Sequence, residues 1–127
     1  MDTRLYFTIA AIVAILFGIA FLLVPAQVSV VYGLIPNPSS VLSDRFFGSA
    51  LLAWGVILWT ARDFSEAAAI RGVLIGSVVG QIVGGAVNVW GTVRGLFNGL
   101  AWTTTILYVL LLIGAIYCLA ASERKTA

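Results

Sequence analysis

The charged residues of this 127-residue chain are confined to a few short clusters, and this spacing constrains its fold more than any other feature. Long apolar stretches lie between the clusters, and a helix needs about 20 apolar residues to cross a membrane. The chain is 61% hydrophobic and 9% charged, whereas about 25% of the residues in a soluble domain are charged. We therefore expect lipid to be the solvent for most of the chain. The charged positions are Asp2, Arg4, Asp44, Arg45, Arg62, Asp63, Glu66, Arg71, Arg94, Glu123, Arg124 and Lys125.

We predict an all-α fold, an integral membrane four-helix transmembrane bundle with up-down topology, in a single domain over residues 1–127. Pro25 ends the first helix because proline interrupts helical hydrogen bonding, and residues 25–36 are expected to form a loop or short helix in the membrane interface. The first stretch could also be a signal peptide, but it exceeds the about 7–15 apolar residues that such a peptide carries. We expect it to be retained. The predicted spans are about 5–24, 41–61, 70–90 and 100–121.

Helix-start signals precede the later spans. Asn37 followed by Pro38 is typical of an N-cap with proline at the first helical position. Asp63 and Glu66 have the spacing of a capping box, although aspartate replaces the usual Ser or Thr. Asn98 is a candidate cap for the last helix. The short turns between the last three spans predict antiparallel neighbours.

Glycine recurs at every fourth position of the third span, at Gly72, Gly76, Gly80 and Gly84, and Asn88 follows in the series. Four residues turn a helix only about 40° past a full turn, so the series forms one slowly turning stripe. Small residues let transmembrane helices approach closely, so we assign these glycines to helix packing, within the bundle or across a dimer. A hinge in a transporter helix is the alternative. We expect the last three spans to pack tightly through their small faces, with the bulky side of the third span toward lipid.

The basic residues predict an orientation. The end of a membrane protein that is richer in Lys and Arg is normally cytoplasmic. We therefore expect a cell (inner) membrane protein with both termini in the cytoplasm and the lipid bilayer as its surroundings. The richer end would hold Arg4, Arg62, Arg71, Arg124 and Lys125, and the other end Arg45 and Arg94.

Several polar residues of the last three spans would meet in the outer half of the bundle. An arginine inside a membrane suggests a functional site, and one interpretation is an outward-facing pocket for a lipid headgroup, a quinone or a small anion, anchored by Arg45. The alternative is that Arg45 reaches the headgroups or ties helices together. Gln81 either lines a conduction path or hydrogen-bonds a facing helix. The candidate ligand-binding residues are Arg45, Ser49, Gln81, Asn88, Thr104 and Tyr108.

The composition argues against catalytic chemistry. The chain has no histidine and one cysteine, Cys118, and it shows no paired carboxylates, phosphate-binding loop or metal-ligand motif. We expect no catalytic residue, no metal and no cofactor, and therefore no enzyme activity. The net charge of +2 is scattered, so we also expect no nucleic-acid partner.

The order of motifs resembles a known group. Pro25 closes the first helix, Tyr32-Gly33 follows, and then come RFFGSALLAWGVILWTAR, the glycine-rich third span and NGLAWTTTILYVLLLIGAIY. This order resembles the small four-helix bacterial inner-membrane proteins that are broadly DoxX-like and mostly uncharacterised. The resemblance implies a four-helix bundle and assigns no activity to any residue.

Three functional classes remain open. The first is a non-catalytic accessory or scaffold protein that associates with itself, as a homo-oligomer, or with a larger membrane complex. The second is a small transporter, channel subunit or lipid- or quinone-binding protein with a polar pocket in the outer leaflet. An enzyme is the third and least favoured class.

Overall fold

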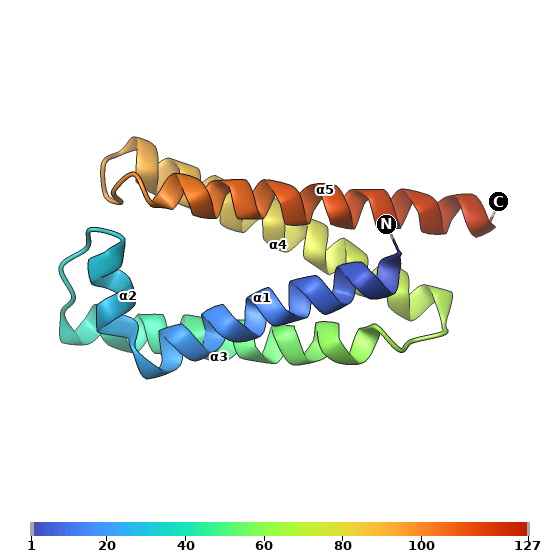
Figure 1. Ribbon diagram of the computed structural model, residues 1–127, viewed down its shortest axis with the longest axis horizontal. Helices are drawn as coiled ribbons and strands as arrows, with labels where there is room; N and C mark the ends of the chain where they lie inside the picture. The colour runs from blue at the N-terminus through green and yellow to red at the C-terminus, as the bar shows by residue number, and fades with distance from the viewer. Residues whose placement is uncertain (1, 127) are drawn as a thin grey trace.

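The computed structural model describes residues 2–126, which form five α-helices and no strand (Figure 1). Four of the helices are long and apolar enough to cross a membrane, as the sequence predicts. The short segment after Pro25 is a helix of seven residues, followed by a loop. The elements are α1 (Thr3–Leu23), α2 (Pro25–Val31), α3 (Pro38–Ala61), α4 (Ala67–Val93) and α5 (Ala101–Thr126).

The long helices form two closely packed pairs. Helix α1 packs along α3, and α4 packs along α5. Helix α4 starts beside the end of α3 and then diverges from it towards α5 (Figure 1). The expectation that the last three spans pack tightly together is therefore wrong. The face of α3 that carries its small residues packs against α1, and α3 touches α4 over a short stretch only.

Three glycines allow the backbones of α1 and α3 to come into direct contact. A Cβ atom on Gly48 would lie 2.8 Å from the Gly18 carbonyl oxygen, and one on Gly18 would lie 2.8 Å from the Leu52 nitrogen. A Cβ on Gly55 would lie 2.6 Å from the Ile15 side chain. No real Cβ atom tolerates such distances, so the two helices can approach this closely because these residues lack side chains.

The predicted glycine stripe of α4 does not form such a seam within the chain. Apart from the surrounding turns of α4 itself, no described atom lies within 4 Å of the position that a Cβ would take on Gly72 or Gly80. Gly76 faces the Trp54 ring of α3, and Gly84 faces a tyrosine ring of α5. Two of the four glycines thus accommodate aromatic rings. The other two contact no other helix of the chain, so packing across a dimer stays a prediction for them.

The close-packed core lies at the end of the bundle that holds both termini, which we call the terminal end. All four long helices contribute side chains there, so this is where the two pairs meet. Its buried members are Tyr6, Phe7, Ala10, Ala11, Ala14, Leu58, Ala61, Leu74, Ala115 and Cys118.

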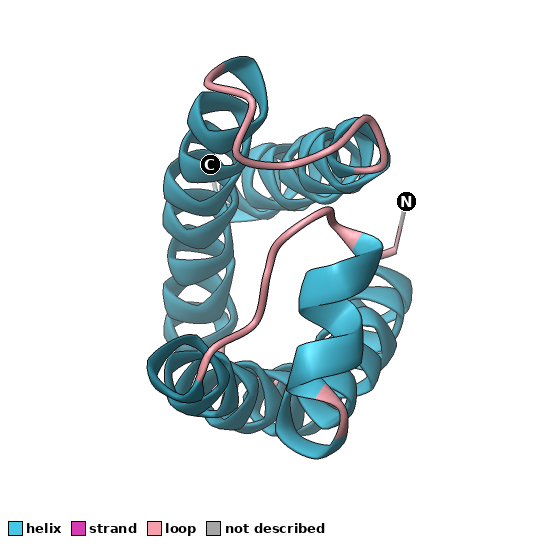
Figure 2. Cartoon of the chain, turned by 90° about the vertical axis from the view of Figure 1, so that its left-hand side faces the viewer, coloured by secondary structure: helices cyan, strands magenta, loops and turns pink. Residues whose placement is uncertain are grey.

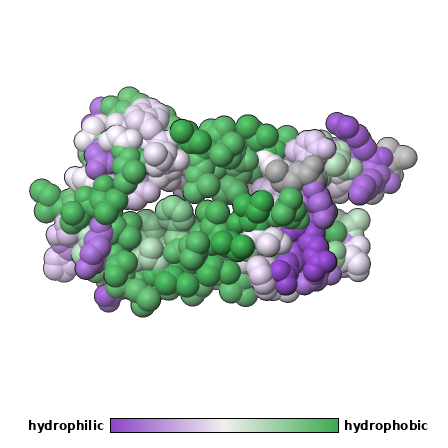
Figure 3. Space-filling view, in the orientation of Figure 1, coloured by the Kyte–Doolittle hydropathy of each residue, from purple (hydrophilic) through white to green (hydrophobic). Residues whose placement is uncertain are grey.

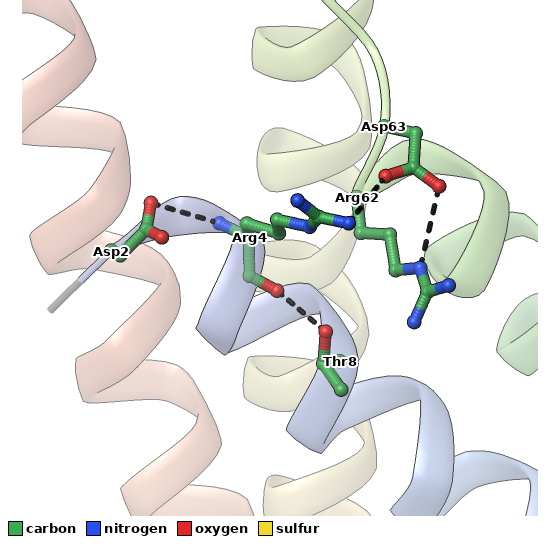
Figure 4. A network of polar contacts seen from close by, with 5 residues as sticks. All are labelled: Asp2, Arg4, Thr8, Arg62 and Asp63. Carbon is green, nitrogen blue, oxygen red and sulfur yellow. Dashed lines mark hydrogen bonds and ion pairs between the residues drawn. The ribbon is translucent and has the colours of Figure 1, made fainter.

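The turn between α3 and α4 differs from its prediction. Glu66 is the N-cap residue of α4, but its side chain makes no capping hydrogen bond. The Asp63 carboxylate instead lies 3.1 Å from Arg4 and 3.4 Å from Arg62 (Figure 4). Two adjacent guanidinium groups attract the carboxylate away from a backbone cap, and the resulting contact ties the start of α1 to the α3–α4 turn.

Other helix ends follow the sequence signals more closely. The Asn37 side chain accepts hydrogen bonds from the Ser39 and Ser40 nitrogens at 3.0 Å, which confirms the predicted cap of α3. Helix α5 continues past the predicted end at residue 121 to Thr126. An ion pair of 3.1 Å between Arg71 and Glu123 holds this extension against α4.

The face seen in Figure 3 carries a broad hydrophobic band with polar groups towards both ends. Chain topology places the five basic residues expected together at the terminal end, opposite Arg45 and Arg94. We call that opposite end the α2 end.

The α1–α3 seam generates a test of what holds the bundle together. Gly48→Ala should lower the free energy of unfolding by about 1–3 kcal/mol, because the added methyl group overlaps backbone atoms of α1. Gly80→Ala is the matched control on α4 and should be neutral or stabilising by up to about 1 kcal/mol, because alanine is a better helix former and open space surrounds this site. Unfolding in mixed micelles followed by circular dichroism measures both, and equal losses would refute the assignment.

Candidate functional site

A cavity of about 490 Å³ lies between the two helix pairs. It begins where the terminal core ends, near Ala10 and Leu58, and extends towards α2. Its volume lies within the range of small-molecule sites, which is about 300–1,000 Å³. The cavity lies in the space that the divergence of α4 from α3 leaves between the two pairs.

The walls are mainly apolar and rich in aromatic side chains. Phe17 and Phe21 come from α1, Phe47 and Trp54 from α3, and Phe97 from the α4–α5 loop. The rings of Phe21 and Phe47 pack edge to face at 5.0 Å between centroids, so the α1–α3 side of the cavity is a fixed aromatic wall. A lipophilic molecule would find apolar contacts along most of this surface.

Asp44 is the one charged side chain among the described residues that line the cavity. It lies on α3 six residues after Pro38, about 9 Å along the helix axis. The Ser29 hydroxyl of α2 donates a hydrogen bond of 2.9 Å to Asp44 Oδ2. Ser29 is buried and Asp44 is half-buried, so a carboxylate lies in a cavity whose other lining residues are uncharged.

Arg45, the anchor in the pocket interpretation, lies outside the cavity, and the alternative that it reaches the headgroups stays a prediction. Arg45 is exposed and does not line the cavity, and neither does Ser49. Successive residues point about 100° apart on a helix, so the residue next to Asp44 points away from the cavity. Ser49 is also exposed, and its hydroxyl donates to the carbonyl oxygen of Phe46 on its own helix at 2.8 Å.

A roof of polar contacts closes the α2 end of the cavity. Tyr32 shares a hydrogen bond between its hydroxyl group and that of Thr104 on α5. The Asn98 backbone N–H donates to the Tyr32 carbonyl oxygen at 2.9 Å, and its side chain donates to the Val31 carbonyl oxygen at 2.8 Å. Seen from this end, α2, the α2–α3 loop and the α4–α5 loop lie in front of the long helices (Figure 2). The roof therefore joins the α1–α3 pair to the α4–α5 pair.

Gly33 allows the roof loop to turn. Its φ angle of 82° lies in the left-handed region, which glycine adopts without steric cost. A Cβ atom there would lie 3.1 Å from the Asn98 Cβ. Asn98 also accepts a hydrogen bond of 3.1 Å from the Leu100 nitrogen just before α5, so this residue both supports the predicted helix start and anchors the roof.

Asn88 serves mainly to join α4 to α5. Its side-chain nitrogen donates to the Ala101 carbonyl oxygen at 3.0 Å and to the Thr105 hydroxyl at 2.8 Å. Both hydrogens of the amide are therefore committed to α5. Asn88 lines the cavity, but its nitrogen has no hydrogen left to offer a ligand.

Gln81 is placed differently. It lines the cavity on α4, about 18 Å along the helix axis from Val93 and thus deeper than Asp44. Its Oε1 atom is buried and has no hydrogen-bond partner among the described residues. Buried polar atoms are nearly always paired, so this oxygen is an exception, and because it is buried it is not itself open to the cavity.

The structure thus brings together four of the six predicted residues. Gln81, Asn88, Thr104 and Tyr108 line the cavity, and the Tyr108 ring packs against Gly84. Sequence reasoning missed the polar residues contributed by α2 and the start of α3. The available signal was an aspartate within an apolar helix, next to the arginine to which the sequence assigns the site. The missed residues are Ser29, Tyr32 and Asp44.

The contrast between the two α4 amides can be tested. Gln81→Met should leave the free energy of unfolding unchanged or raise it by about 1 kcal/mol, because it removes a buried acceptor without a partner. Asn88→Leu should lower it by about 0.6–1.7 kcal/mol, because it breaks two hydrogen bonds to α5. Unfolding curves in mixed micelles measure both, and equal losses would show that Gln81 also has a structural partner.

The chain matches no curated protein and no solved structure. The resemblance to DoxX-like proteins stays a prediction, because no comparison bears on it. One family model covers residues 2–120, almost the whole chain, and its description is a domain of unknown function. The chain belongs to this family, DUF8292.

Proposed function

We propose that this chain is a non-catalytic membrane protein that binds a lipophilic small molecule between its two helix pairs. The observation that carries the proposal is the cavity of about 490 Å³ with aromatic walls and one carboxylate. Protein interiors are close-packed and contain few voids larger than a water molecule. A cavity of this size in a chain of 127 residues is therefore better explained as a binding site than as a packing defect.

The cavity favours this function over that of a pure scaffold. A scaffold needs outward surfaces and gains nothing from an internal space, which removes apolar contacts from the bundle. Self-association remains a second candidate because Gly72 and Gly80 face open space on α4. The two functions are compatible, since that glycine face lies outside the cavity lining.

We place the protein in the inner membrane with both termini in the cytoplasm. The proposal is supported by four helices of sufficient length and apolarity and by the five basic residues at the terminal end, which is the cytoplasmic pattern. The α2 end and Asp44 would then lie in the outer half of the membrane. A ligand would reach the cavity from the outer leaflet, because the roof closes the α2 end.

Retention of a ligand can be tested by native mass spectrometry of protein purified in mild detergent. The wild-type chain should carry one lipophilic molecule per protomer. Leu51→Trp should lose at least nine-tenths of it, because Leu51 lines the cavity and the larger ring fills the space. Leu42→Trp is the matched control: it lies on the same helix, is 58% exposed and should retain the molecule.

The outcome that contradicts this function is equally clear. Wild-type protein without any bound molecule, which also fails to take up added lipophilic compounds, would refute it. Equal retention by both tryptophan variants would show that the molecule binds the outer surface. Thermal unfolding followed by circular dichroism verifies that both variants are folded.

The orientation has its own test. In a Cys118→Ala background, Leu96→Cys should react with a membrane-impermeant maleimide on intact cells, because Leu96 is exposed in the α4–α5 loop. Phe64→Cys, in the α3–α4 turn, should react after the cells are opened. The reverse pattern would place the termini outside.

A further inference from the structure

We infer that the cavity selects lipophilic molecules with a positively charged ammonium head, which Asp44 binds. This inference rests on the proposed binding function and specifies the chemical class of its ligand. The ammonium group would lie near the α2 end, and the hydrocarbon part would extend along the aromatic walls towards Gln81.

The first argument is the unbalanced charge of Asp44. The ion pairs found among residues 2–126 join Asp63 to Arg4 and Arg62, and Glu123 to Arg71. None involves Asp44, which has one hydrogen bond from Ser29. A half-buried carboxylate is costly unless its charge is compensated, and a cation from outside the protein supplies the missing charge.

The second argument is the hydrogen-bonding state of the carboxylate. Asp44 accepts one hydrogen bond, from the Ser29 hydroxyl, and a carboxylate can accept several. The Asn88 and Asn98 side-chain nitrogens already donate to backbone carbonyl oxygens. An ammonium group carries several N–H donors. A quinone, whose carbonyl oxygens accept and do not donate, makes no such bond to Asp44, and a small anion would be repelled.

The third argument is the aromatic surroundings of the carboxylate. Phe47 follows Asp44 by three residues, so both lie on the same face of α3. The Tyr32 ring stands edge to face with Phe97 at 6.0 Å between centroids, beside the roof. Aromatic faces attract cations, most strongly where water is excluded. The same walls that bind the hydrocarbon part therefore also favour a positive head.

A matched set of probes tests the inference. The protein is placed in phosphatidylcholine nanodiscs, and Trp59, Trp90 and Trp102, all of them exposed, are changed to phenylalanine. Trp54, which lines the cavity, then reports binding by its fluorescence. The probes are spin-labelled alkyl chains that differ only in the head group: a primary ammonium, an alcohol and a sulfate.

The ammonium probe should quench Trp54 at a concentration at least tenfold lower than the alcohol, with the sulfate weakest, because charge-assisted hydrogen bonds are the stronger ones. Asp44→Asn should remove this preference for ammonium while the alcohol binds within about twofold of its original affinity. Glu66→Gln, which removes a carboxylate far from the cavity lining, should leave all three affinities unchanged. The comparison of probes on the unaltered cavity stands even if Asp44→Asn fails to fold.

The results separate the inference from the function on which it rests. Equal quenching by the ammonium and alcohol probes overturns the ammonium selectivity and leaves the binding function intact. A preference for ammonium that survives in folded Asp44→Asn protein overturns the role of Asp44. Failure of every probe to quench Trp54 overturns the binding function itself.

The ammonium head could belong to a free lipophilic amine or to an aminophospholipid. Nanodiscs that contain phosphatidylethanolamine distinguish these sources by competition. If the headgroup of that lipid occupies the site, the ammonium probe should need at least tenfold higher concentration than in phosphatidylcholine alone. Unchanged quenching assigns the site to free amines, and both results support recognition of an ammonium group.

Discussion

The backbone contact between α1 and α3 determines the rest of the architecture. Gly18, Gly48 and Gly55 let these helices approach until a single added carbon atom would clash with the opposite backbone. Close packing of this kind uses the small face of each helix, and van der Waals contact is a main driving force for helix association in lipid. Because α3 is fixed against α1, it has no small face left for α4. The second pair therefore forms separately, and space remains between the two.

Much of the fold could be predicted from the sequence because it follows from local signals. Uncharged stretches of sufficient length identify the four long helices, and Asn37-Pro38 identifies the start of α3. Pairing was harder, because every long helix carries small residues. The glycine spacing in α4 is the more regular pattern, but the less regular glycines at positions 18, 48 and 55 make the closest contacts with the backbone of another helix. Periodicity shows which residues share a face, and it does not show which helix covers that face.

The cavity was predictable in part for the same reason. Gln81, Asn88, Thr104 and Tyr108 lie on helix faces that the 3.6-residue repeat brings together, and all four line the cavity. Asp44 and Arg45 are adjacent, and the sequence gives no phase accurate enough to decide which of them points inward. The contribution of α2 depends on a tertiary contact, the hydrogen bond from Ser29 to Asp44, which no local pattern encodes.

The roof has a thermodynamic consequence. Tyr32 lies on the α1–α3 side of the cavity, whereas Asn98 and Thr104 lie on the α4–α5 side. Their hydrogen bonds therefore form at one particular separation of the two helix pairs. A molecule bound in the cavity touches both helix pairs and therefore also affects the distance between them. The two equilibria are therefore linked. If a bound molecule changes the equilibrium constant for forming the roof hydrogen bonds by some factor, formation of those bonds changes the affinity for the molecule by the same factor.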